Sequence, residues 1–147
     1  MDKFIIQGGK PLSGQMTPSG NKNSALPLMA ACLLTDEPVV LHNMPNITDT
    51  QTMRHLIESL GVKVRRIGDS SSYEFTADDI HPSDLDPDLC RRIRASILLA
   101  GPMVARSGEV SLPPPGGDVI GRRRVDTHIL ALRSLGASLD MNGNFNF

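Results

Sequence analysis

An acidic residue stands shortly before a run of arginines in the stretch PPPGGDVIGRRR, residues 113–124. The planar fork of arginine binds phosphates and carboxylates through paired hydrogen bonds, and Asp118 places an acid only a few residues from these fixed positive charges. Pro113 to Pro115 stiffen the approach, and Gly116 and Gly117 are expected to leave the loop free to move. The stretch therefore suits a polyanionic substrate, although three arginines taken alone are typical of a solvated surface.

A second basic residue occurs in SGNKNSALPL, residues 19–28. Gly20 permits a tight turn, and Asn21 or Asn23 can cap a helix that begins near Lys22. The helix macrodipole disfavours a cation at this end by about 0.3–1 kcal/mol, so an anion bound there would account for the lysine. A solvated lysine in an ordinary capping turn explains the same residues.

A third basic group lies in DPDLCRRIRASILL, residues 86–99. Arg91 and Arg94 are three apart and are predicted to share a helix face, whereas Arg92 points elsewhere. The apolar run that follows predicts that this helix enters the core with its basic start at the rim. An alternative is that Asp86 and Asp88 simply pair with these arginines.

The elements that must position these residues alternate between strand and helix, which predicts an α/β or α+β fold. Gly61 and Gly136 suit the position just after a helix end. The expected strands cover residues 3–7, 38–43, 62–67, 73–77 and 108–113, and the expected helices cover 22–34, 49–60, 86–105 and 124–135.

The chain also repeats its own layout. Each half runs through an apolar helix, a short strand, a loop, a helix that ends in SLG (residues 59–61 and 134–136), and a further strand. Duplication predicts similar units that share one core, and basic residues at helix starts in both copies favour a shared anion site. The loop of the second copy is longer by the PPPGGD segment, and added loop length is where function tends to be inserted.

Composition excludes several classes of function. The formal net charge of −1 and the aromatic content of 3% argue against a nucleic-acid partner. No apolar run is long enough to span a membrane, and without an export signal we expect a cytoplasmic protein in which Cys32 and Cys90 are buried thiols. The histidines, including His128, lack metal-like spacing, and nucleotide-binding glycine motifs are absent, so we expect neither a metal nor a cofactor.

Taken together, SGNKNSALPLMAACLLTDEPVVLHNMPNITD and RASILLAGPMVARSGEVSLPPPGGDVIGRRRVDTHILALRSLGA closely resemble the UDP-N-acetylglucosamine 1-carboxyvinyltransferases. The resemblance implies transfer of the enolpyruvyl group of phosphoenolpyruvate to the 3′-hydroxyl of UDP-N-acetylglucosamine, with release of phosphate. This is the first committed step of peptidoglycan synthesis, and so bears on cell wall biogenesis, cell shape, the cell cycle and cell division. The fold it implies is an "inside-out" α/β barrel of two lobes, each built of three βαβ-type repeats.

The resemblance also assigns roles to residues. Lys22 and Asn23 match the pair that contacts phosphoenolpyruvate, and Lys22 is counted with the catalytic residues. Arg94 matches an arginine at the nucleotide-sugar and phosphate site, and Asp118 matches the loop acid that protonates the methylene carbon of phosphoenolpyruvate. The segment that receives the uridine nucleotide corresponds to Arg123, Arg124, Val125, Asp126 and Thr127.

Two positions depart from the common pattern of that family. Asp118 stands where many members have the cysteine that the epoxide fosfomycin attacks, which implies fosfomycin resistance. A carboxylic acid can still donate the proton if its surroundings raise its pKa. Arg124 stands where proline is common, which leaves the start of the following helix less preformed.

The resemblance implies a particular domain organisation. We expect residues 1–19 to pack with a second lobe, residues 20–83 and 84–147 to form two first-lobe repeats, and the second lobe to be absent. The chain would then be an amino-terminal portion of a larger enzyme and inactive by itself. Two alternatives remain open, a 3-phosphoshikimate 1-carboxyvinyltransferase and a non-catalytic lobe that binds anions.

Overall fold

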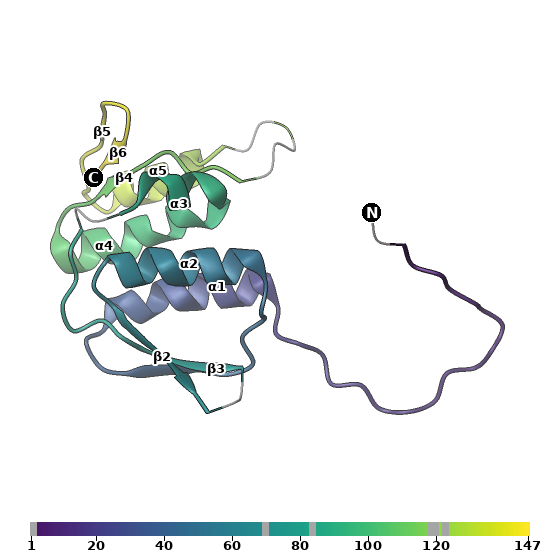
Figure 1. Ribbon diagram of the computed structural model, residues 1–147. Helices are drawn as coiled ribbons and strands as arrows, with labels where there is room; N and C mark the ends of the chain where they lie inside the picture. The colour runs from purple at the N-terminus through teal and green to yellow at the C-terminus, as the bar shows by residue number, and fades with distance from the viewer. Residues whose placement is uncertain (1–2, 69–70, 83–84, 118–120, 122–123) are drawn as a thin grey trace.

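The computed structural model describes residues 3–68, 71–82, 85–117, 121 and 124–147, in which an extended N-terminal segment precedes two units of similar layout (Figure 1). The first unit contains α1 (Lys22–Ala31), the 3₁₀ helix η1 (Cys32–Leu34), β1 (Val39–Leu41), α2 (Thr48–Ser59), β2 (Lys63–Ile67) and β3 (Ser72–Thr76). The second contains α3 (Pro87–Arg92), the 3₁₀ helix η2 (Arg94–Leu99), α4 (Ala100–Ser107), β4 (Ser111–Leu112), α5 (Asp126–Ser134), β5 (Asp140–Met141) and β6 (Phe145–Asn146).

The two sheets have the same strand order. The first is β1-β3-β2 and the second is β4-β6-β5, and every pairing in both is antiparallel. Because β1 and β2 both run antiparallel to β3, they run parallel to each other, with α2 as the connection between them. The repeated βαβ-type unit expected from the sequence is therefore confirmed, with a third strand inserted between the two parallel ones.

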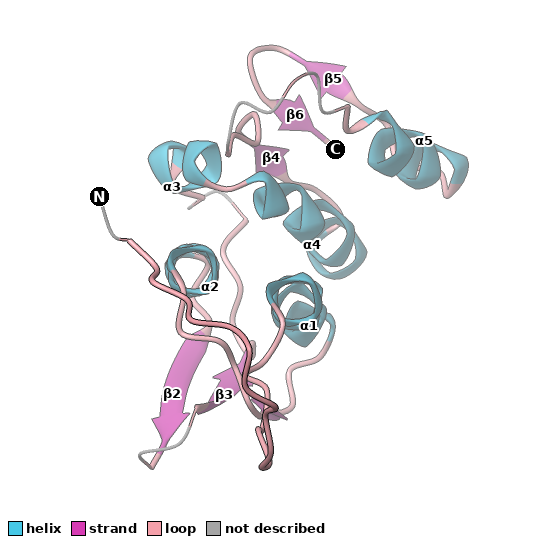
Figure 2. Ribbon diagram, turned by 90° about the vertical axis from the view of Figure 1, so that its right-hand side faces the viewer, coloured by secondary structure: helices cyan, strands magenta, loops and turns pink. Residues whose placement is uncertain are grey.

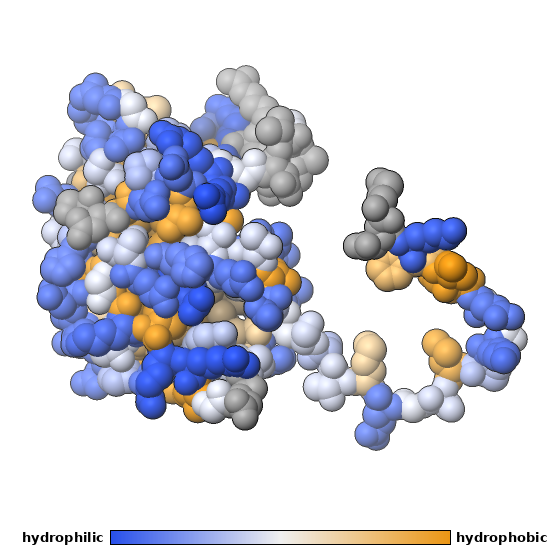
Figure 3. All heavy atoms as spheres, viewed as in Figure 1, coloured by the Kyte–Doolittle hydropathy of each residue, from blue (hydrophilic) through white to orange (hydrophobic). Residues whose placement is uncertain are grey.

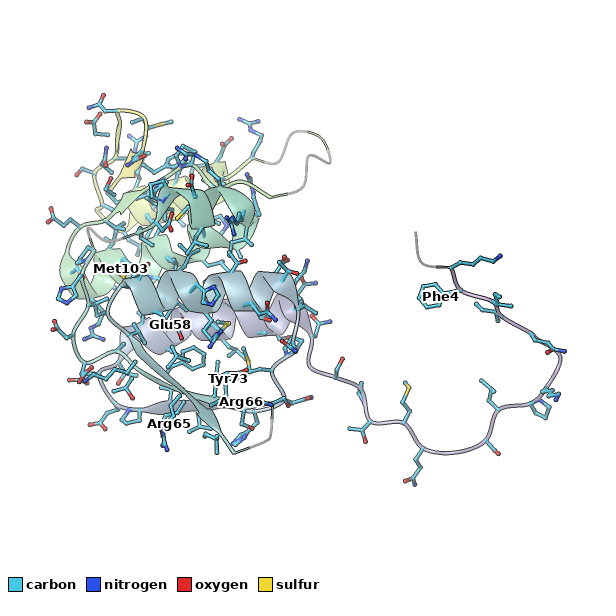
Figure 4. The ribbon with its side chains drawn as sticks, viewed as in Figure 1. Phe4, Glu58, Arg65, Arg66, Tyr73 and Met103 are labelled. Carbon is cyan, nitrogen blue, oxygen red and sulfur yellow. The ribbon has the colours of Figure 1, made fainter. Side chains whose placement is uncertain are left out.

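Helices α1, α2 and α4 lie between the two sheets (Figures 1 and 2), whereas α5 buries none of its residues. Helix α2 buries Met53, Leu56, Ile57 and the following Leu60 completely, which is the spacing of one helix face. On β3, Phe75 is buried on the side that faces the helices. Figure 4 shows Tyr73 between the first sheet and the helices and Arg65 below the sheet, away from them.

The helix predicted over residues 86–105 is wrong as a single element. Helix α3 ends at Arg92, and Ile93 is extended (φ −129°, ψ 137°) before η2 begins. The fully buried Ser96 hydroxyl makes hydrogen bonds to the carbonyls of Cys90 (3.2 Å) and Ile93 (3.0 Å) at this break. The single hydroxyl proton of Ser96, shared between these two carbonyls, stabilises the interruption together with the burial of Ile93.

Residues 3–21 contain neither helix nor strand, so the strand predicted over residues 3–7 is wrong. Phe4, Ile5 and Leu12 are 94%, 85% and 99% exposed. Figure 3 shows this segment leading away from the body with apolar atoms open to solvent. A strand needs a partner edge for its backbone groups, and in the described structure this segment has none. Its packing against a second lobe stays a prediction, as do the boundaries between the repeats.

The two helix ends with glycine agree with prediction. Gly61 follows α2 with φ +95°, and Gly136 follows α5 with φ +101°, a region that favours glycine.

The two units are also joined by Arg106 of α4, whose guanidinium donates to the carbonyls of Leu33 (3.0 Å) and Ala77 (3.2 Å).

Candidate functional site

Helix α1 presents Lys22 and Asn23 at its first turn. The side chain of Asn21 is the cap, because its oxygen accepts from the backbone N–H of Asn23 at 2.8 Å. A Cβ on Gly20 would lie 1.8 Å from the carbonyl oxygen of Asn43, so only glycine permits this approach between the two backbone segments. The start of α1 is thereby held against the end of β1.

The break at Ile93 decides which arginines face the cleft. Arg92 and Arg94 line it, one at the end of α3 and the other at the start of η2. Arg91 instead pairs with Asp88 at 3.1 Å on the exposed side. The prediction that Arg91 and Arg94 share a face, with Arg92 pointing elsewhere, is therefore wrong, because the helix does not continue past Arg92.

Asp86 has a structural role in the same segment. Its carboxylate accepts from the backbone N–H groups of Asp88 (2.8 Å) and Leu89 (3.3 Å) and so caps α3. The alternative, in which Asp86 and Asp88 pair with the arginines, is therefore correct for Asp88, which pairs with Arg91. Asp86 instead accepts hydrogen bonds from free backbone N–H groups at the start of α3.

The glycines of the PPPGGD segment do not act as predicted. Gly116 and Gly117 donate backbone hydrogen bonds to the carbonyls of Cys90 (3.2 Å) and Arg91 (3.1 Å). A Cβ on Gly116 would lie 1.6 Å from the Arg91 carbonyl oxygen, and Gly117 has φ +95° with its Cβ position 3.1 Å from the Arg94 nitrogen. These glycines allow the loop root to pack tightly against α3 and η2, rather than freeing it.

These elements together line a cleft of about 400 Å³. That volume lies within the range of about 300–1,000 Å³ that is usual for small-molecule sites. Its described lining residues are Lys22, Asn23, Leu26, Pro27, Asp49, Arg92, Ile93, Arg94, Ala95, Ile97, Leu98, Gly117, Arg124, Val125 and His128.

The cleft is electropositive for two reasons. Its described lining contains four permanent cations, Lys22, Arg92, Arg94 and Arg124, against one carboxylate, Asp49. Helices α1, α2 and α5 also begin at this cleft, so the positive ends of their dipoles point at it. Such an arrangement can bind a multiply charged anion and stabilise negative charge that develops on it.

The segment predicted to receive the uridine nucleotide reaches the cleft in part. Arg124 and Val125 line it, and the Arg124 guanidinium pairs with the Asp126 carboxylate at 2.5 Å. Thr127 is exposed and is not in the lining. Asp118, Arg122 and Arg123 lie outside the described residues.

Sequence reasoning missed Asp49, Arg92 and His128 as cleft residues. Lys22 and Asp49 form an ion pair of 2.8 Å across the starts of α1 and α2. The repeat could have revealed Asp49, because aligning Gly61 with Gly136 places it opposite Arg124. His128 was rejected as a metal ligand because of its spacing, but it lines the cleft from the first turn of α5.

Both cysteines are buried and free, as expected. Burial raises the pKa of the Cys32 thiol to about 11, and the Sγ donates to the Leu28 carbonyl at 3.2 Å. Burial, with a contribution from Asp86, raises the pKa of the Cys90 thiol to about 11. Neither thiol lines the cleft.

A family model matches residues 6–147, which is nearly the whole chain. The description of that family is EPSP synthase (3-phosphoshikimate 1-carboxyvinyltransferase). The chain belongs to this family. Membership confirms the enolpyruvyl transferase resemblance seen in the sequence.

Relatives within the family carry the more specific name expected from the motifs. UDP-N-acetylglucosamine 1-carboxyvinyltransferase of Bradyrhizobium diazoefficiens is 56% identical over 145 residues, covering 99% of this chain and 33% of the relative. The protein of the same name from Treponema denticola is 48% identical, covering 100% of this chain and 34% of the relative. The chain thus spans about a third of the length of these relatives.

The fold agrees with a solved member of the enolpyruvyl transferases. The crystal structure of the enolpyruvyl transferase NikO from Streptomyces tendae matches with a TM-score of 0.73 at 27% identity. The match covers 95% of this chain and 30% of that chain. The predicted α/β fold of repeated units, about one lobe of the enolpyruvyl transferase architecture, is confirmed.

Proposed function

We propose that the protein containing this chain transfers the enolpyruvyl group of phosphoenolpyruvate to the 3′-hydroxyl of UDP-N-acetylglucosamine and releases phosphate. The relatives from Bradyrhizobium diazoefficiens and Treponema denticola, at 56% and 48% identity, carry the name of this activity. The protein would then supply a precursor of peptidoglycan and work in the cytoplasm. None of the described helices has the length and apolar character needed to cross a bilayer.

The observation that carries the proposal is the electropositive cleft. Lys22 and Asn23 come from the first unit and Arg94 and Arg124 from the second, yet all four line one cavity. Phosphoenolpyruvate and a nucleotide diphosphate sugar both carry several negative charges. Arginine side chains bind such groups through two parallel hydrogen bonds, and the lysine ammonium adds a compact positive charge with no fixed direction of approach.

In this proposal Lys22 and Asn23 contact phosphoenolpyruvate, and Arg94 binds at the boundary between the two substrates. Residues 123–127 receive the uridine nucleotide. Arg124, where proline is common in the family, would add a cation to this part of the cleft, since it lines the cavity.

Asp118 would donate a proton to the methylene carbon of phosphoenolpyruvate. The adjacent C2 then becomes electron-poor, and the 3′-hydroxyl oxygen bonds to it as its own proton leaves. Phosphate departs with the proton lost by the hydroxyl, and return of a methyl proton to the Asp118 carboxylate forms the carbon–carbon double bond of the product enol ether. Gly117, the residue before Asp118, lines the cleft, which supports this assignment.

The test is a phosphate-release assay on the full-length protein with phosphoenolpyruvate and either UDP-N-acetylglucosamine or shikimate 3-phosphate as acceptor. We expect turnover with the nucleotide sugar only, and a product whose mass equals the nucleotide sugar plus an enolpyruvyl group. Lys22→Ala should abolish this turnover, whereas Lys63→Ala, on β2 and outside the cleft, should leave it intact.

The family description makes 3-phosphoshikimate 1-carboxyvinyltransferase the second candidate function. Turnover with shikimate 3-phosphate in place of the nucleotide sugar would replace our proposal with that activity. Phosphate binding without turnover on either acceptor would favour a lobe that only binds anions.

A further inference from the structure

Asp49 is the one carboxylate among the described residues that line the cleft. A negative charge in this position repels the anions that the other charged side chains attract, so its presence there needs a compensating role. Its Oδ2 lies 2.8 Å from the Nζ of Lys22. The two side chains are 36% and 49% exposed, so a ligand in the cleft can reach both of them.

The charges of the two helix starts explain why the pair forms between helices. Lys22 is the first residue of α1, where the macrodipole disfavours a cation, and the first turn of α1 contains no acidic residue. Asp49 is in the first turn of α2, where the macrodipole favours a carboxylate. Asp49 therefore supplies to Lys22 the counter-charge that α1 itself lacks.

Contacts of the backbone position both residues of this ion pair. Gly20, two residues before Lys22, packs on Asn43, which has the left-handed φ of 54°. The hydroxyl of Thr50 donates to the Pro45 carbonyl at 2.6 Å, which fixes the start of α2 beside Asp49. Both partners thus project from helix starts that are held in place independently of any ligand.

We propose that Asp49 is a positioning residue, whose carboxylate holds the Lys22 ammonium in the orientation that the reaction uses. The role rests on the function proposed above. Asp49 does not bind substrate, and its charge weakens anion binding while it orders the lysine. Removal of the carboxylate therefore has opposite effects on binding and on turnover.

The kinetic test compares Asp49→Ala and Asp49→Asn in the full-length protein. We expect kcat to fall about 100-fold for alanine, as for a misplacement of about 1 Å, and less for asparagine, which keeps an acceptor oxygen. The KM for phosphoenolpyruvate should stay unchanged or decrease, because a repelling charge has gone. A merely structural role would instead raise KM and lower the temperature of unfolding together, and that result would overturn the proposal.

The matched control is Asp78→Ala. Asp78 pairs with Lys63 at 2.6 Å on the surface, and neither residue lines the cleft. Asp78→Ala removes an exposed ion pair of the same kind, but outside the cleft. We therefore expect kcat and KM to stay within about twofold of the parent values. An equal loss of kcat in Asp49→Ala and Asp78→Ala would mean that the position of the pair is irrelevant, and the proposal would be wrong.

A second measurement needs no turnover. An amine-acylating reagent should label Lys22 about two- to fivefold faster in Asp49→Ala than in the parent, the factor that the strength of an exposed ion pair converts to. Lys63 should be labelled faster only in Asp78→Ala, and inorganic phosphate should slow labelling of Lys22. If the parent lacks activity on both acceptors while Lys22 labelling changes as expected, the proposed function fails and the ion pair stands. If Lys22 is labelled equally in Asp49→Ala and in the parent, Asp49 does not hold the lysine.

Discussion

Gly116→Ala should damage both stability and turnover, although it adds a single methyl group. The new Cβ would lie 1.6 Å from the Arg91 carbonyl oxygen and 2.4 Å from its carbonyl carbon. Non-bonded heavy atoms require about 3.5 Å, so the backbones must separate by about 1.5–2 Å. Both neighbours are backbone atoms, so no side-chain rotation can relieve the contact.

The energetic cost follows from what this separation breaks. If the loop root moves away, the hydrogen bonds from Gly116 (3.2 Å) and Gly117 (3.1 Å) are lost. Each contributes about 1 kcal/mol net, which gives about 2 kcal/mol. If the root stays in place, overpacking costs about 1–3 kcal/mol instead. Either route lowers the free energy of unfolding by a similar amount.

Catalysis should respond more strongly than stability. The loop root leads directly into Asp118, the proposed proton donor, and a displacement of about 1 Å can cost about 100-fold in rate. The assays are thermal unfolding and phosphate release by the full-length protein. Gly101→Ala is the matched control: its Cβ would meet nothing within 4 Å, and it lies inside α4, where alanine is favoured over glycine by about 0.5–1 kcal/mol. A Gly116→Ala protein that unfolds and turns over like the parent would refute the packing of this loop root against α3.

The remaining predictions concern the loop acid, the thiols and the isolated chain. Asp118→Ala should lower turnover by about 10²–10⁴-fold if Asp118 is the general acid. The parent should resist fosfomycin, whereas Asp118→Cys should show time-dependent inactivation with a mass gain of one inhibitor; an adduct on the parent would contradict the assignment of the loop position. Cys32 and Cys90, with pKa values of about 11, should resist alkylation at pH 8 until the protein unfolds, as counted by mass spectrometry. Since burial favours the protonated thiols, their contribution to stability should be complete below their ordinary pKa of 9.0 and lost as the pH rises towards 11, which a pH series of unfolding midpoints would show. The 147-residue chain alone should release no phosphate from the two substrates, and turnover near the enzyme median of about 10 s⁻¹ would refute this.

Local features of the fold could be predicted from the sequence because they depend on neighbouring residues. The apolar spacing of residues 49–60 predicted α2, and Gly61 and Gly136 marked two helix ends through the left-handed φ that glycine tolerates. The similarity between the two halves predicted the repeated unit. Membership of the family could also be predicted, because several motifs occur in the right order along the chain.

Tertiary structure decided which side chains share the cleft. Nothing in the local pattern around Ile93 shows that a buried Ser96 hydroxyl will donate to the Cys90 and Ile93 carbonyls where the helix is broken. Because of that break, Arg92 lines the cleft in place of Arg91. The strand predicted over residues 3–7 was wrong because strand formation depends on a partner edge, which is a property of distant residues.

The same reason applies to the remaining errors and omissions. Gly116 was read as a source of mobility, yet its lack of a side chain serves a close approach to the Arg91 carbonyl, which is distant in sequence. Asp49 and Lys22 form an ion pair because α1 and α2 pack side by side, which the spacing of the two residues in the sequence does not reveal. Periodicity and capping depend on residues a few positions apart, whereas close backbone approaches and cross-helix ion pairs depend on packing between elements, which one-dimensional spacing does not contain.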